Sequence, residues 1–215
     1  MNESDEKTDL VDIRVVLDQN ENTLKHLILG GCSDIDDSLD TAFESVTINN
    51  LTHLDLFGTF ISSFVLDRIT SAHNLQSLTL HGTFVEPAQM FAIDSIERTP
   101  TVFPHLESFR FVMQEGNNDL YESVVHFLRK REKIRRLDLG RCPWNLVQDV
   151  LADMRNLKVL AVCIENLSEE EIEFLVEEIP TQMVAIKLSV DVSDKPLVLM
   201  FPHLMRLKPL ICSLG

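Results

Sequence analysis

The sequence predicts an α/β fold, a curved solenoid of about eight repeats with parallel strands on the concave face and helices on the convex face. Three observations support it: a recurring L-x-x-L-x-L template, a polar residue or cysteine at the ninth position of each repeat, and amphipathic segments between templates. The stretches LTHLDLFGTF (51–60) and LQSLTLHGTF (75–84) show the repeat most clearly. The templates begin at Leu24, Leu51, Leu75, Leu106, Ile134, Leu157, Met183 and Leu204.

Each template has the alternation of a short strand. In its L-x-L part, two hydrophobic residues point into the core and the residue between them points outward. A single unit of this kind cannot bury its apolar face, so neighbouring units must stack. With 45% hydrophobic residues in 215, the chain can build one such domain. We expect residues 1–23 to form an N-terminal cap and residues 24–215 to form the repeat domain.

The ninth position of each repeat predicts how the turn after the strand is held. A side chain there can bond to loop backbone that lacks another partner. Three of the four cysteines fall at this position, so we expect free structural thiols in a reducing compartment rather than disulfides. The residues at this position are Cys32, Thr59, Thr83, Gln114, Cys142, Glu165, Asp191 and Cys212.

Most segments between the strands have the period of amphipathic helices. Ser168 and Glu171 fit a capping box, which predicts a helix start. Pro87 is suited to the first turn of another helix. The residues before the first strand predict a capping helix. The apolar stripes are Leu10/Ile13/Val16/Leu17, Ile35/Leu39/Phe43/Val46, Leu120/Val124/Phe127/Leu128, Leu146/Val147/Val150/Leu151/Met154 and Ile172/Leu175/Val176/Ile179.

The repeat resembles the leucine-rich repeat family, in its cysteine-containing form with irregular repeat lengths, over roughly residues 24–212. The stretches FPHLESF (103–109) and FPHLMRL (201–207) look like the leucine-rich portions of fungal F-box proteins. That resemblance implies repeats that hold a substrate for a ubiquitin ligase, and an N-terminal F-box that binds a ligase adaptor. Residues 1–23 are shorter than an F-box and contain no LP-x-E-like start.

The outward-facing strand positions form the expected binding surface. In a curved solenoid, the third, fifth and seventh template positions point out from the concave face. From the second to the fifth strand they mix aromatic, acidic and basic side chains, which suits protein recognition; an ordinary solvated sheet face is the alternative. From Val159 to Ala185 the face becomes small and apolar, which indicates a covered surface or a partner contact. The expected partner-binding residues are His53, Asp55, Phe57, Thr79, His81, Arg110, Arg136 and Asp138.

Composition and motifs favour a binding protein over an enzyme. A formal net charge of −15 disfavours nucleic acid and anionic membranes as partners. The sequence has no P-loop, dinucleotide fingerprint, HExxH or GxSxG motif, and we expect no cofactor and no metal. The start MNESDEKTDL does not resemble a secretory signal, and no apolar run is long enough to cross a bilayer. We therefore expect a non-catalytic protein-interaction module in the cytoplasm, with the nucleus as the alternative compartment.

A metal enzyme or a hydrolase is the alternative of another class. His26 and His53 occupy the same template position in adjacent repeats, and Asp55 is near, so a zinc or copper site is one hypothesis. A solvated histidine pair is favoured over it. Hydrolysis by His53, Asp55 and Ser77 is disfavoured, because a shared sheet face does not supply a nucleophile–base hydrogen bond.

Two charged runs allow a structural and a functional interpretation. RKREKIRR (129–136) indicates a nuclear-import or phosphate-binding segment, or cations that complement the carbonyl end of a helix; the second is favoured. EEEIEFLVEE (169–178) predicts an amphipathic helix with acidic residues at its start, and an acidic docking surface is the alternative.

Overall fold

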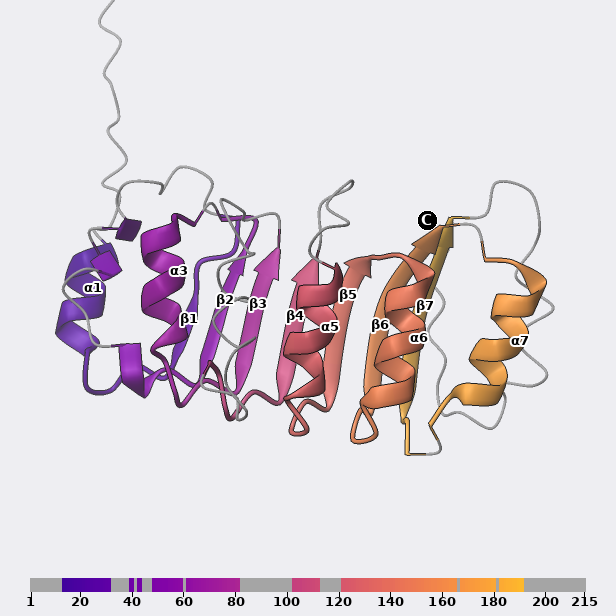
Figure 1. The fold of residues 1–215 in the computed structure, drawn as a ribbon. Coiled ribbons are helices and arrows are strands. Elements are labelled where there is room, and N and C mark those ends of the chain that lie inside the picture. Colours follow the sequence, from indigo (N-terminus) through magenta and orange to yellow (C-terminus); the bar gives the residue numbers. More distant parts are fainter. Residues whose placement is uncertain are drawn as a thin grey trace, which may run out of the picture.

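The computed structural model is an α/β structure built on one open, seven-stranded, all-parallel sheet. It describes residues 13–31, 39–40, 42–43, 48–59, 61–81, 102–112, 121–165, 167–180 and 182–191. The strands follow chain order, and each is hydrogen-bonded to the next (Figure 1). They are β1 His26–Ile28, β2 His53–Phe57, β3 Ser77–His81, β4 Ser108–Val112, β5 Arg136–Arg141, β6 Val159–Glu165 and β7 Ala185–Asp191.

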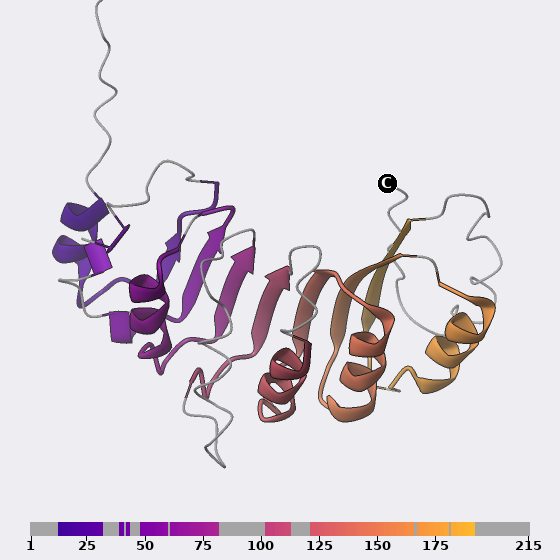
Figure 2. The ribbon, with the colours of Figure 1, turned by 45° about the horizontal axis from the view of Figure 1, so that its top comes forward.

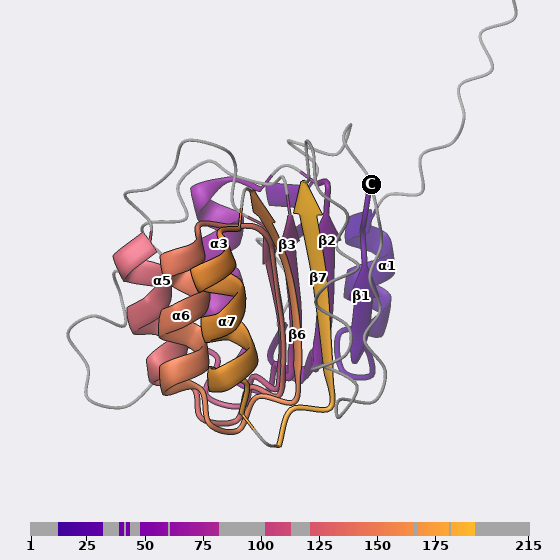
Figure 3. The ribbon, with the colours of Figure 1, turned by 90° about the vertical axis from the view of Figure 1, so that its right-hand side faces the viewer.

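Helices α3, α5, α6 and α7 all lie on one side of the sheet, as the end-on view in Figure 3 shows. Helix α1 stands at the N-terminal end of the row of strands (Figures 1 and 2), and the end-on view of Figure 3 shows it beside β1 and apart from that helix layer. One strand and one return connection per coil are consistent with an α/β solenoid, so the α/β class is confirmed. The helices are α1 Ile13–Asn20, α3 Ser63–Thr70, α5 Tyr121–Arg129, α6 Trp144–Asp153 and α7 Glu169–Glu178, with a short 3-10 turn η1 at Ile48–Asn50.

The strand register places equivalent template positions of neighbouring coils side by side, with one shift after Asp138 of β5. This holds for the fourth template position, where each side chain is paired with its counterpart in the next strand and is buried. Burying one such aliphatic side chain contributes about 2 kcal/mol, which is why the apolar row rather than the loops fixes the stacking. The row consists of Leu27, Leu54, Leu78, Phe109, Leu137, Leu160 and Ile186.

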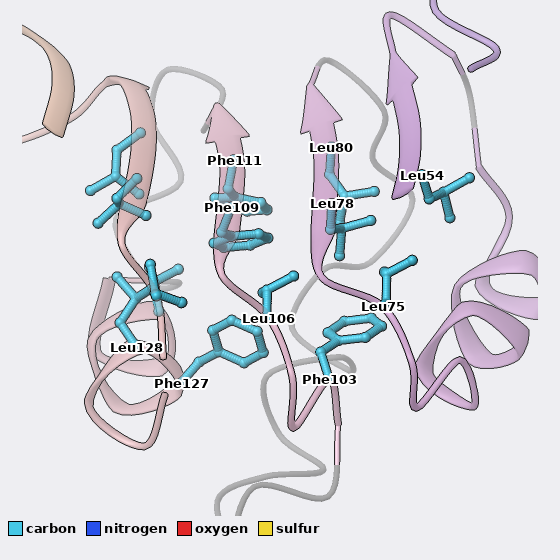
Figure 4. Packing of buried hydrophobic residues seen from close by; sticks show 14 of the residues in the cluster. Leu54, Leu75, Leu78, Leu80, Phe103, Leu106, Phe109, Phe111, Phe127 and Leu128 are labelled. Atoms are coloured by element: carbon cyan, nitrogen blue, oxygen red, sulfur yellow. The ribbon is translucent and has the colours of Figure 1, made fainter. Parts of the chain in front are cut away.

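Phenylalanines fill the core at the fourth strand (Figure 4). The ring centroids of Phe109 and Phe127 lie 5.3 Å apart, and those of Phe109 and Phe111 lie 5.8 Å apart. Phe103, from the FPH stretch, is fully buried although its φ of 51° is in the left-handed region. That backbone conformation costs about 1–2 kcal/mol for a non-glycine residue, so the burial of the ring must offset it.

The ninth position can be followed at Thr59 and Cys142, and the predicted bond to loop backbone is present at Thr59. Thr59 is buried, and its hydroxyl donates to the Leu29 carbonyl of the preceding coil at 2.5 Å. Cys142 is a buried free thiol, and burial raises its pKa to about 12. The side chains at Cys32, Thr83, Gln114, Glu165, Asp191 and Cys212 lie outside the described residues.

A ladder of amide side chains joins neighbouring coils at the N-terminal edge of the sheet, the lower edge in Figure 1. Asn74 Nδ2 donates to the Asn49 carbonyl at 2.7 Å, and Asn156 Nδ2 donates to the Glu132 carbonyl at 3.0 Å. Each donor is the residue directly before a template, so the same repeat position makes the same kind of contact in different coils. Two further contacts complete the ladder in the described residues: the side chain of Asn50 donates to the Glu21 carbonyl, and that of Gln182 donates to the Arg155 carbonyl.

Several predicted helix features are confirmed. Ser168 and Glu171 form the capping box of α7, with contacts of 3.2 and 2.8 Å. The stripe at residues 146–154 is buried throughout, and Leu39 and Phe43 are also buried. The helix expected from Pro87 and the eighth template at Leu204 lie outside the described residues, as does Leu10.

Two helix predictions need correction. Val16 is not part of a buried stripe, since it is 39% exposed while Leu17 on the same helix is buried. Helix α3 was not among the expected stripes, although Val65, Leu66 and Ile69 bury one face of it. Ser62 caps it by accepting a hydrogen bond from the Val65 N–H. A serine three residues before an apolar pair is the sequence signal that could have found it.

Candidate interaction surface

The face of the sheet opposite α3, α5, α6 and α7, called the strand face below, carries the predicted binding residues. Because side chains alternate along a strand, the third, fifth and seventh template positions leave the core and emerge here. The burial patterns of β2 and β4 show this alternation directly. The register fixes which of these side chains are neighbours on adjacent strands.

Arg110 is the centre of the best-defined cluster on the strand face. Its guanidinium carbon lies 4.7 Å from the centroid of the Phe57 ring, and its Nε lies 3.1 Å from Asp138 Oδ2. Phe57 is on β2, Arg110 on β4 and Asp138 on β5, so one side chain links three strands and reaches across β3. The Arg110 side chain is still 43% exposed. It is therefore positioned from two sides while it remains open to solvent.

The two predicted acidic residues also shape the backbone. Asp55 Oδ1 accepts from the N–H of Phe57 at 2.9 Å, and Asp138 Oδ1 accepts from the N–H of Gly140 at 3.1 Å. Both contacts join a carboxylate to the backbone two residues further along, as in an Asx turn. Asp138 therefore divides its two oxygens between the Gly140 backbone and Arg110. The sequence interpretation did not foresee this structural role of the acids.

A bulge interrupts the strand face at β5. Asp138 pairs with Ala161, but the next register pair joins Gly140 to Val162, so Leu139 is the extra residue. Gly140 has a φ of 56°, and a Cβ at this position would come within 2.6 Å of Val112 Cγ1. Only glycine avoids both the backbone cost and the collision. The seventh template position of this coil therefore carries no side chain.

The predicted histidine pair is present. The ring centroids of His26 and His53 lie 4.2 Å apart, and His53 Nδ1 lies 2.9 Å from Thr52 Oγ1. Partial burial, and then the nearby charge of His26, lower the pKa of His53 from its ordinary value. Within the described ranges, no three His, Cys, Asp or Glu side chains are grouped closely enough to hold a metal ion.

The remaining predicted residues have diverse positions. Thr79 is half-buried between β2 and β4, and Arg136 is exposed at the start of β5. His81 ends β3 in register with Phe57 and Val112, and its side chain lies outside the described residues. The structure thus brings Phe57, Arg110 and Asp138 into contact and leaves Arg136 out of that contact.

The strand face changes character at β6 and β7. Val159, Ala161, Cys163 and Ala185 are all half-buried, small or apolar, and Val159 pairs with Ala185 in the register. Lys187 is the exposed cation next to them, paired with Ala161. The contrast expected from the sequence is therefore placed on one continuous sheet.

The basic run at 129–136 is dispersed by the fold. Arg129 ends α5 and contacts Asp149 and Asp153 of α6, at 3.5 and 2.5 Å. Arg131 is only 3% exposed, lies over the Phe127 ring and donates to the Phe127 and Val102 carbonyls. The favoured interpretation, cations at a helix C-terminus, holds for Arg131, since Phe127 is in the last turn of α5.

Two open pockets lie at the N-terminal edge of the sheet rather than on the strand face. The first, of about 300 Å³, spans the edge below β1 to β4. The second, of about 340 Å³, lies below β5 and β6, and the basic run contributes Lys133 and Arg135 to it. These pockets went unnoticed in the sequence because their residues are separated by whole repeats, although each residue occupies a fixed position next to a template.

Comparison with protein-family models gives no match, and comparison with curated proteins gives none either. Among the helices of the described ranges, none combines the length and apolar character needed to span a bilayer.

Proposed function

We propose that the chain is a leucine-rich repeat protein that binds a protein partner on its concave strand face, without catalytic turnover. The template, its ninth position and the in-register stacking of the coils support the repeat assignment. The observation that carries the binding proposal is the cluster of Phe57, Arg110 and Asp138. It forms on the face that carries the mixed aromatic and charged side chains.

The cluster suits protein recognition for an energetic reason. Arginine and aromatic residues supply much of the binding energy at protein interfaces, particularly near the centre of the contact. An arginine that is free in solution loses rotamer entropy when it binds, about 0.5–1.5 kcal/mol for a side chain of this kind. Arg110 is already positioned by the ring and the carboxylate, so it loses less.

Affinity capture with matched variants tests the proposal. The wild-type chain, a Phe57→Ala/Arg110→Ala double variant and an Asp67→Ala variant would be used as baits, with bound proteins identified by mass spectrometry. Asp67 is exposed on α3, on the helix side of the sheet, and is the control. We expect at least one partner that the wild type and Asp67→Ala capture and that the double variant loses. Equal recovery of every partner by all three baits would refute binding through this cluster.

A further inference from the structure

The pocket below β5 and β6 gathers an unusual set of side chains for so acidic a chain. Its lining comprises Lys133, Arg135, Asn156, Lys158 and Glu132. Three cations and one carboxylate give a formal charge of +2 (three minus one), whereas the whole chain carries −15. Local charge and overall charge therefore have opposite signs at this place on the surface.

Stacking of the coils forces these cations together. Lys133 and Asn156 each directly precede a template, and Arg135 and Lys158 each follow the first template residue. The backbone N–H of Lys158 donates to the Arg135 carbonyl at 2.9 Å, so these two residues lie side by side on adjacent coils. Equivalent positions on adjacent strands are about 4.8 Å apart. Like charges at that spacing are destabilising, and a bound anion would relieve the repulsion.

The cations are available for a ligand. Lys133, Arg135 and Lys158 are exposed, and none of them forms an ion pair with another residue in the described part of the chain. Lys133 Nζ lies 2.8 Å from His105 Nδ1, and His105 lines the neighbouring pocket, so this contact holds the ammonium between the two pockets without neutralising it. Asn156 is fixed by its hydrogen bond to the Glu132 carbonyl.

The other pocket on the same edge provides an internal comparison. It has a similar size, about 300 Å³, and its lining is Asn22, Lys25, Asn50, Thr52, Asn74, Gln76 and His105. With histidine counted as neutral, Lys25 gives this pocket a formal charge of +1, against +2 for the pocket below β5 and β6. In the described part of this edge, the cations therefore gather at the pocket below β5 and β6 rather than at the pocket below β1 to β4.

We propose that the pocket below β5 and β6 binds a phosphate group through Lys133, Arg135 and Lys158. Lysine and arginine supply charge-assisted hydrogen bonds to phosphate oxygens, and an arginine can donate two in parallel. A pocket of about 340 Å³ is within the range that holds small organic ligands, so the phosphate can be free or can belong to a phosphorylated side chain. This site is separate from the strand face, and its test does not require the partner proposed above.

An NMR titration of the full chain with inorganic phosphate tests the site. Sodium chloride at matched ionic strength is the reference, because screening of exposed charges can by itself change the chemical shifts of nearby amides. We expect saturable changes confined to the backbone amides around residues 132–135 and 156–158. Lys133→Ala and Lys158→Ala should each weaken phosphate binding about five-fold, because a unit charge at 4 Å in water contributes about that factor. Lys187→Ala, an exposed cation on the strand face, should leave it unchanged.

Changes that chloride reproduces, or equal affinity in the wild type and Lys158→Ala, would overturn the site. Lys133→Gln and Lys158→Gln provide a second pair if an alanine variant fails to fold, judged from its amide spectrum. A phosphoserine peptide and its serine counterpart then distinguish the source. Tighter binding of the phosphopeptide than of inorganic phosphate identifies a phosphorylated partner, and equal affinity identifies free phosphate.

Discussion

The strand face has two dissimilar halves on the same backbone frame. On β2 to β5, Arg110 stacks on Phe57 and contacts Asp138, so the exposed side chains are large, charged and in contact with one another. On β6 and β7, Val159, Ala161 and Ala185 present small apolar groups. Register and burial beneath the two halves are the same. Stacking therefore determines the inward positions of each coil and leaves the outward positions free for recognition.

The bulge at Gly140 marks the boundary between the halves, and changing it should have the largest effect. A positive φ costs about 1–2 kcal/mol for alanine, and collision of the new Cβ with Val112 adds about 1–3 kcal/mol. We expect Gly140→Ala to lower the free energy of unfolding by about 3 kcal/mol, measured by urea denaturation.

Gly31→Ala is the matched control for this change. Gly31 has a φ of 77°, but nothing lies within 4 Å of the position that its Cβ would occupy. Gly31→Ala should lower the free energy of unfolding only by the cost of the positive φ, about 1–2 kcal/mol. Adding Val112→Ala to Gly140→Ala should recover part of the loss. If Gly31→Ala and Gly140→Ala cost the same, the proposed contact with Val112 is wrong.

Loss of the hydrogen bond between the Thr59 hydroxyl and the Leu29 carbonyl should have the next largest effect on stability. Thr59→Val keeps the shape and removes the donor, which leaves the Leu29 carbonyl without it, at a cost of about 1–2 kcal/mol in unfolding free energy. Thr70→Val removes a comparable but exposed hydrogen bond to the Asp67 carbonyl, and should change stability by less than about 0.5 kcal/mol. Thermal or chemical unfolding of both variants separates them, and equal losses would argue against a specific role of the ninth position.

A double-mutant cycle should measure the contact between Phe57 and Arg110, in the half of the strand face on β2 to β5. Phe57→Leu and Arg110→Met remove the ring and the charge separately, and we expect a coupling of about 0.5–1 kcal/mol between them. The pair Phe57→Leu and Lys187→Met provides the control, because Lys187 is on β7. Unfolding free energies of the four chains in each cycle give the coupling. A coupling near zero in the first cycle would mean that the cation–π contact does not persist in solution.

The smallest expected effect concerns His53. Its folded-state pKa is lowered, so the unfolded chain binds the proton more readily, and His53 lowers stability as the pH falls from about 6.5 through the lowered pKa. His26→Gln removes the charge contribution and should raise the His53 pKa partway towards its ordinary value. An NMR titration of the His53 ring in both chains measures this. A downward shift, or no shift, would contradict the contribution of His26.

The core was predictable and the cluster was not, for a physical reason. Leu54, Leu78 and Leu137 follow from a local pattern, because a strand sends alternate residues inward and stacking aligns them. Contact between Phe57 and Arg110 depends on how far two side chains reach across an intervening strand. Sequence spacing gives the shared face but not that reach.

Other differences arise from single residues that oppose a general rule. Arginine is rarely buried unless it is paired, yet stacking on Phe127 and two carbonyl acceptors allow Arg131 to be buried. Gly140 occupies an ordinary template position, and only the bulge shows why it must be glycine.

Alkylation of Cys163, measured by peptide mass spectrometry with and without the captured partner, tests the binding surface most directly. Cys163 is a half-exposed free thiol on β6, two strands or roughly 10 Å from Arg110, which is within an interface of ordinary size. Buried Cys142, with its raised pKa of about 12, should be unreactive in both samples and serves as the internal control. We predict that the partner slows alkylation of Cys163 about ten-fold or more. An unchanged rate in the complex would contradict binding across the strand face.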